Sequence, residues 1–78
     1  MYCIKGTYID LNSIILAEED VDVLVDLNLY FYIIKIVFQN NYTIKLSYLK
    51  DEYKKYQEDF SNLINAINKC HENNKKKG

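Results

Sequence analysis

The stretch from Leu29 to Tyr48, LYFYIIKIVFQNNYTIKLSY, constrains the fold of this 78-residue chain more than any other. Ten residues rich in β-branched and aromatic side chains lead into Gln39-Asn40-Asn41, and a shorter alternating run follows. Such side chains pack well on a pleated surface, and asparagine tolerates the left-handed conformation that tight turns require. The stretch therefore predicts a β-hairpin.

The alternation in the second arm predicts the register, because a shift by one residue would move every side chain to the other face. One face carries the apolar side chains of this arm: Tyr42, Ile44, Leu46 and Tyr48. A three-residue loop at 39–41 pairs Ile34 with Leu46 on that face and leaves Lys35 opposite Lys45 on the other. A two-residue turn would place Lys35 in the core, where an unpaired ammonium group is costly. We therefore predict the three-residue loop.

The C-terminal part predicts one amphipathic helix that begins near residues 49–51. Its apolar residues recur at alternating spacings of four and three, the period of one helix face: Leu49, Tyr53, Tyr56, Phe60, Leu63, Ile67 and Cys70. Asp51 and Glu52 lie in the first turn and Lys69 lies in the last, as the helix dipole favours.

The N-terminal third predicts further strands. In our interpretation, Tyr2–Lys5 and residues 8–10 form one strand that bends at Gly6. Residues 14–26 form either one long bent strand or two short strands broken near Glu19. Segments rich in Asp, Asn and Ser separate these strands and predict turns.

These elements predict an α+β fold, an antiparallel β-sheet of four to five strands in a meander with the C-terminal amphipathic helix packed on one face. Residues 1–70 form a single domain, and residues 71–78 form a frayed basic tail. No stretch approaches the ~20 apolar residues of a membrane span, and the start lacks signal-peptide features, so we expect a cytoplasmic protein. Cys3 and Cys70 have no C-x-x-C spacing, and we expect free thiols rather than a bridge between the termini.

An acidic segment precedes the hairpin and gives the chain a charge asymmetry. Residues 1–34 carry one Lys against six carboxylates, whereas residues 35–78 carry nine Lys against five. The acidic segment comprises Glu18, Glu19, Asp20, Asp22 and Asp26. Three interpretations stay open: a metal site, a surface that docks a basic partner, and a solvated strand edge whose charges prevent pairing. Because no Ca²⁺-loop pattern is present, we expect no metal and no other cofactor.

Catalytic patterns are absent from the sequence. His71, the only histidine, directly follows Cys70, and adjacent helix residues point about 100° apart and seldom converge. There is no glycine-rich phosphate loop and no arginine. We therefore expect that the protein is not an enzyme. Eight tyrosines could stack nucleic-acid bases, but their acidic surroundings favour core packing, so nucleic acid is the less favoured partner.

The odd-numbered face of the first hairpin arm is more apolar than a small domain needs. Lys35 alone interrupts its apolar side chains, which are Leu29, Phe31, Ile33 and Val37. If the helix covers the even-numbered face, this row either meets a partner or is wrapped by the N-terminal strands. A partner could be a second copy, which would make a homodimer, or a different protein.

Residues 8–14, the hairpin and the helix together resemble in style the small phage-encoded inhibitors of host defence, such as anti-CRISPR proteins. Such inhibitors commonly bind a larger nuclease, and the resemblance therefore implies a partner of that class. It assigns no functional residues. We predict a non-enzymatic protein-binding module that uses the acidic segment and the odd-numbered face. The alternatives are a single-stranded nucleic-acid binder that uses sheet tyrosines and a self-associating structural protein.

Overall fold

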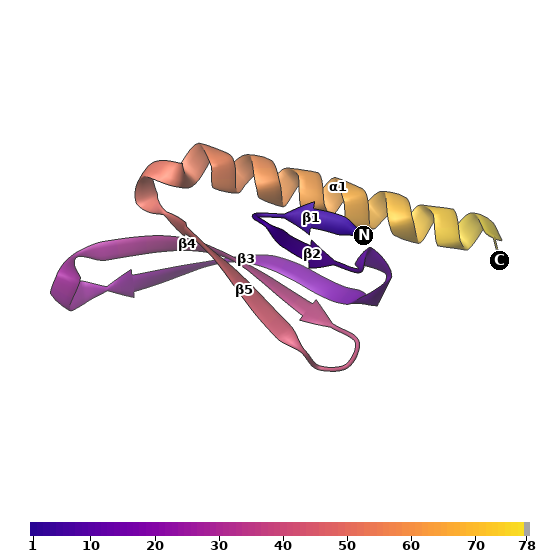
Figure 1. Cartoon of the computed structure of the whole chain (residues 1–78), viewed down its shortest axis with the longest axis horizontal. Coiled ribbons are helices and arrows are strands. Elements are labelled where there is room, and N and C mark those ends of the chain that lie inside the picture. The colour runs from indigo at the N-terminus through magenta and orange to yellow at the C-terminus, as the bar shows by residue number, and fades with distance from the viewer. Residues whose placement is uncertain (78) are drawn as a thin grey trace.

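Two antiparallel sheets and one long helix make up the chain in a computed structural model, which describes the backbone of residues 1–77 and the side chains of residues 1–72 (Figure 1). The strands are β1 (Tyr2–Ile4), β2 (Thr7–Ile9), β3 (Ile14–Leu24), β4 (Leu29–Phe38) and β5 (Thr43–Leu49). Helix α1 (Tyr53–Lys77) follows β5, and short 3-10 turns stand at Leu11–Ser13, Val25–Leu27 and Lys50–Glu52. The predicted α+β class is confirmed, with the five strands divided between a β1-β2 sheet and a β3-β4-β5 sheet.

The β4–β5 hairpin has the predicted register. Ile34 lies opposite Leu46, and Lys35 lies opposite Lys45. The three-residue loop is closed by the Phe38 N–H, which donates to the Tyr42 carbonyl oxygen at 2.8 Å. Asn41 adopts the left-handed conformation with φ 65°, as expected of an asparagine in a tight turn.

Strand β3 is one continuous strand of 11 residues that runs antiparallel to β4. A register shift between Ile14 and Leu16 marks a bulge near its start, and no break occurs at Glu19. The chain turns through Val25–Leu27 and Asn28, whose φ is 52°. The strand order β3-β4-β5 places β3 at an edge of its sheet.

The prediction of one N-terminal strand bent at Gly6 is wrong. Lys5 and Gly6 both have positive φ, 49° and 76°, and this two-residue turn reverses the chain. β1 and β2 therefore pair with each other antiparallel, with Ile4 opposite Thr7. A lysine in the left-handed region is uncommon, so Lys5-Gly6 is not a typical hairpin-turn sequence.

Helix α1 and the β1–β2 hairpin both pack on the face of the larger sheet that carries the even-numbered residues of β4 and β5 (Figure 1). The buried core joins all three: Ile4, Ile9, Ile14, Ile34, Ile36, Leu46, Tyr48, Tyr56, Leu63 and Ile67. Ile34, Ile36 and Leu63 are completely buried. The alternating apolar residues of the hairpin and the regularly spaced apolar residues of the helix thus pack together in one core.

Helix α1 begins close to the predicted position. The Leu49 N–H donates to Glu52 Oε1 at 2.9 Å, which caps the 3-10 turn before Tyr53. The helical backbone continues to Lys77. The predicted frayed tail comprises residues 71–78, and the side chains of residues 73–78 lie outside the described part of the chain. The domain boundary at residue 70 stays a prediction.

The end of the β3–β4 hairpin projects beyond the start of the helix (Figure 1). We call residues 18–30 the arm. Every residue of the arm is exposed, and the molecule is accordingly elongated, with extents of 52 × 26 × 18 Å. The arm therefore lies outside the core that holds the rest of the chain together.

Candidate partner-binding surface

Part of the acidic segment and the apolar row predicted from the sequence lie on one face of the larger sheet. Residues that stand opposite each other in an antiparallel pair project to the same side. Asp22 lies opposite Phe31 and Asp20 lies opposite Ile33. We call this side the outer face, and it comprises Leu16, Glu18, Asp20, Asp22 and Leu24 of β3, Leu29, Phe31, Ile33, Lys35 and Val37 of β4, and Thr43, Lys45, Ser47 and Leu49 of β5.

No element of the described chain covers the outer face. None of its residues belongs to the core cluster or to the partly buried side chains that pack against that cluster. Ile4 and Ile9 of the β1–β2 hairpin instead pack into the core on the opposite face. The alternative in which N-terminal strands wrap the odd-numbered face is therefore wrong.

Exposed leucines border the apolar row of the outer face. Leu24 and Leu29 stand opposite each other and are 45% and 40% exposed, and Leu49, opposite Phe31, is 48% exposed. Ile33 is only 6% exposed, although it lies outside the core cluster. Ile33 is thus the one buried residue of the outer face, in the middle of the apolar row.

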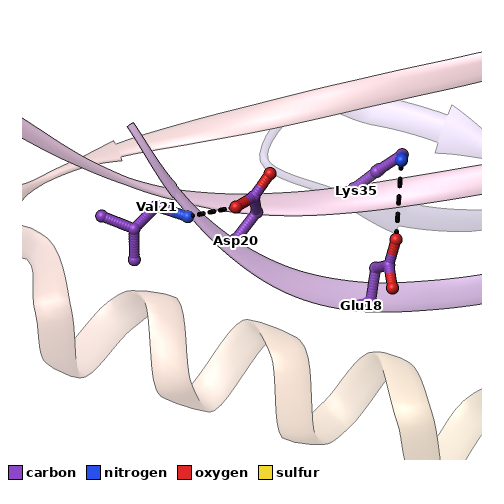
Figure 2. A network of polar contacts seen from close by, with 4 residues as sticks. All are labelled: Glu18, Asp20, Val21 and Lys35. Atoms are coloured by element: carbon purple, nitrogen blue, oxygen red, sulfur yellow. Dashed lines mark hydrogen bonds and ion pairs between the residues drawn. The ribbon is translucent and has the colours of Figure 1, made fainter. Parts of the chain in front are cut away.

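Lys35 divides the apolar row and is itself partly neutralised. Its Nζ lies 3.5 Å from Glu18 Oε1, across from β3 (Figure 2). Both side chains are substantially exposed, so this ion pair contributes little to stability. Among the side chains that the structure describes, Asp20 and Asp22 have no ion-pair partner, and their charges remain available to a ligand.

Two residues of the acidic segment lie elsewhere. Glu19 stands opposite Ile34 on the helix side, where its Oε2 accepts a hydrogen bond of 2.9 Å from the Tyr56 hydroxyl. Asp26 lies in the 3-10 turn at the tip of the arm. The acidic segment is thus split, and only Glu18, Asp20 and Asp22 contribute to the outer face.

All four tyrosines of the larger sheet's strands and hairpin loop lie on the helix side: Tyr30, Tyr32, Tyr42 and Tyr48. Tyr32 stacks on Tyr56 with ring centroids 5.1 Å apart and lies 4.7 Å from the ring of Tyr53. Tyr32 and Tyr48 thus pack against the start of the helix, whereas Tyr42 lies beside Phe38 at the hairpin loop and is 60% exposed. The outer face carries no tyrosine.

Sequence reasoning missed two grooves beside the arm. One has a volume of about 710 Å³ and lies between the arm and the start of the helix, with Val23, Tyr30 and Leu49 in its lining. The other, of about 330 Å³, lies along β3 and is lined by Glu19, Asp20, Val21, Tyr32, Tyr53 and Tyr56. The alternating valines of β3 and the tyrosines of the helix were the available signals.

Groups that could support metal or thiol chemistry are dispersed. No group of three or more His, Cys, Asp or Glu side chains within residues 1–72 could hold a metal ion. Cys3 and Cys70 are free thiols, and the Cys70 Sγ donates to Asn12 Oδ1 at 2.9 Å. No helix in the described part of the chain is long and apolar enough to cross a membrane.

No protein-family model, curated protein or solved structure matches this chain.

Proposed function

We propose that this protein is a non-enzymatic, cytoplasmic protein-binding module whose outer face docks on a larger partner. One observation carries the proposal: the register of β3 and β4 places Asp20 and Asp22 beside the apolar row on a face that the described chain leaves uncovered. A contiguous apolar surface bordered by charge is typical of an interaction site.

The chemistry of the outer face indicates the kind of partner. Phe31, Ile33 and the bordering leucines supply apolar contact, and the carboxylates of Asp20 and Asp22 attract a basic surface. Proteins that handle nucleic acids present such basic surfaces. We propose that the protein is a small phage or mobile-element inhibitor that binds a nucleic-acid-handling host protein, such as a CRISPR nuclease, in keeping with the resemblance in style.

A pull-down from a lysate of the native host tests the role of the acidic row, by which we mean Glu18, Asp20 and Asp22 on the outer face. The variant carries Asp20→Lys with Asp22→Lys, and the matched control carries Glu58→Lys with Glu72→Lys on exposed positions of α1. We expect the wild-type protein and the control to retain the same partner and the variant to lose it, because the variant opposes a basic surface with lysines. Circular dichroism checks that both variants are folded.

Retention of the same proteins by the Asp20→Lys and Asp22→Lys variant would remove the acidic row from the proposal. Rising salt should release the partner from the wild-type protein, since exposed charges are screened within about 8–10 Å at moderate ionic strength. A partner that stays bound at every salt concentration would contradict a charge-guided interface.

Self-association is the second candidate, and the exposed leucines of the outer face favour it. A homodimer that buries this patch would need no other protein. Single-stranded nucleic-acid binding is less well supported, because the sheet tyrosines pack toward the helix and the exposed face is acidic. Absence of binding to a labelled oligonucleotide at low salt would remove that alternative.

A further inference from the structure

We propose that the free edge of β3 takes up an extended segment of the partner as an additional antiparallel strand, in which basic and apolar side chains alternate. This inference rests on the proposed function and names the chemistry of the partner segment. Strand addition of this kind uses main-chain hydrogen bonds for affinity and alternate side chains for specificity.

The edge of β3 is open to such a strand. β3 pairs only with β4, and the smaller β1-β2 sheet stays separate from it. Val21 and Val23 are 45% and 48% exposed, so the edge is accessible along the arm. A strand edge that is exposed and unpaired is a template for another chain.

The hydrogen bonds of β4 show which backbone groups of β3 face outward. The Phe38 N–H bonds to the Tyr42 carbonyl on the β5 side, whereas the Gln39 N–H bonds to the Ser13 carbonyl on the β3 side. Successive residues of a strand direct their N–H and C=O groups to opposite sides. Odd-numbered residues of β4 therefore bond to β3, and their direct opposites Glu18, Asp20 and Asp22 point back to β4.

The residues between these acids must then direct their backbone groups to the free edge: Glu19, Val21 and Val23. The hydrogen bonding of Val21 agrees with this, because its N–H donates to the Asp20 carboxylate at 2.8 Å (Figure 2). An acidic side chain thus occupies a donor that a neighbouring strand would use. An incoming carbonyl group can replace it, which frees the Asp20 carboxylate for a cation.

The side chains on either side of the edge select the sequence of the incoming strand. On the outer face, Asp20 and Asp22 have no ion-pair partner among the described side chains, and they favour Lys or Arg at alternate positions. On the helix side, Val21 and Val23 favour apolar residues. The groove of about 330 Å³ beside Val21, with Tyr32 and Tyr53 in its wall, has room for a large apolar side chain.

A second copy of β3 is a poor occupant of this edge. Antiparallel pairing of two β3 strands would bring the carboxylates of Asp20 and Asp22 close to those of the partner copy on one face. Like charges across a strand pair are destabilising. Charge complementarity therefore favours a basic segment of another protein.

A labelled short peptide in which Lys alternates with Val, with one Phe among the valines, tests the inference by fluorescence anisotropy at low salt. The control peptide has the same composition with its lysines and apolar residues in separate blocks. We expect the alternating peptide to bind at least about tenfold more tightly, because only its pattern matches both sides of the edge. Equal affinity of the two peptides would overturn the proposal.

Backbone methylation separates strand addition from simple charge attraction. In an antiparallel pair, the apolar residues of the peptide direct their N–H groups to β3, so N-methylation there removes the main-chain bonds. We expect a loss of at least about tenfold. N-methylation at the lysines faces solvent and should change little. Equal binding of the two methylated peptides, or a loss on methylation of the lysines alone, would overturn antiparallel addition.

A matched pair of protein variants tests the charge selection. Asp20→Asn with Asp22→Asn should weaken binding of the alternating peptide by about tenfold, whereas Glu58→Gln with Glu72→Gln should leave it unchanged. Unchanged binding by the first variant would overturn this selection. If no peptide binds while the pull-down still depends on Asp20 and Asp22, strand addition fails and the proposed function stands.

Discussion

At the scale of single residues, two buried tyrosine hydroxyls hold carboxylates on the helix side of the sheet. The Tyr48 hydroxyl donates to Asp59 Oδ2 at 2.7 Å, and the Tyr56 hydroxyl donates to Glu19 Oε2 at 2.9 Å. The two residues are 1% and 2% exposed. Burial, reinforced by these hydrogen bonds to carboxylates, raises the pKa of both tyrosines well above the ordinary value of 10.0.

The raised pKa values predict a loss of stability in strong base. Below pH 10 the tyrosines are protonated in both states, and their contribution is fully present. As the pH rises above 10, the unfolded chain releases these protons and the folded chain does not, so the free energy of unfolding falls toward the folded pKa values. The fall reaches about 1.4 kcal/mol per pH unit for each tyrosine.

Urea unfolding over a series of pH values measures this loss. Tyr56→Phe should flatten the alkaline slope by one proton, and Tyr8→Phe, at a position that is 71% exposed, serves as the control. An alkaline slope that Tyr56→Phe leaves unchanged would contradict the assignment of the proton to this hydroxyl.

At the scale of elements, one face of β4 packs into the core and its other face forms part of the outer face. Ile34 is completely buried in the core cluster, whereas its neighbour Ile33 is 6% exposed and lies outside that cluster. The alternation of the hairpin and the cost of burying Lys35 were enough to predict this division and the register of β4 with β5.

Two features of the elements could not be read as clearly. The acidic row of β3 and the apolar row of β4 share a face because of the register in which the two strands pair. That register is set by the length of the turn after Leu24 and not by the composition of either row. Alternation along β3 places Glu19 on the face opposite to Glu18 and Asp20, although the three acids are consecutive in the sequence. The Lys5-Gly6 turn has no periodic signal at all.

Alanine substitutions on the two faces of β4 should have unequal effects on stability. Ile34→Ala leaves a cavity between sheet and helix and should lower the free energy of unfolding by about 4 kcal/mol, while Ile33→Ala, at a position outside the core cluster, should cost about 2 kcal/mol. Urea denaturation gives both values. Ile34→Val offers a milder variant, with about 1 kcal/mol expected, if the alanine variant does not fold. Equal losses from the two alanines would mean that the outer face is packed as the core is.

At the scale of the whole molecule, the charges are unevenly distributed and the shape is elongated. The chain has a formal net charge of −1, yet the arm carries acids on a structure 52 Å long whose helix is rich in lysine. Lys35 stands where the outward row of β4 would otherwise be continuously apolar. A charge in such a position limits association between copies.

Removal of this charge should therefore promote self-association. Lys35→Val joins the two parts of the apolar row, and it sacrifices only an exposed ion pair with Glu18. Sedimentation velocity over a range of concentrations should show larger species for Lys35→Val than for the wild-type protein. Lys69→Val, on an exposed helix position, is the matched control. If Lys35→Val stays monomeric at every concentration, Lys35 does not limit self-association.

The projecting arm has a thermodynamic consequence for recognition. Few buried contacts hold residues 18–30, so the arm can open locally without unfolding the core, and its opening free energy lies toward the low end of the range. A partner that binds there must also fix the arm, and the conformational entropy lost in doing so offsets part of the contact energy. If the proposed surface binds a partner, it would thus gain the ability to adapt its shape at a cost in affinity.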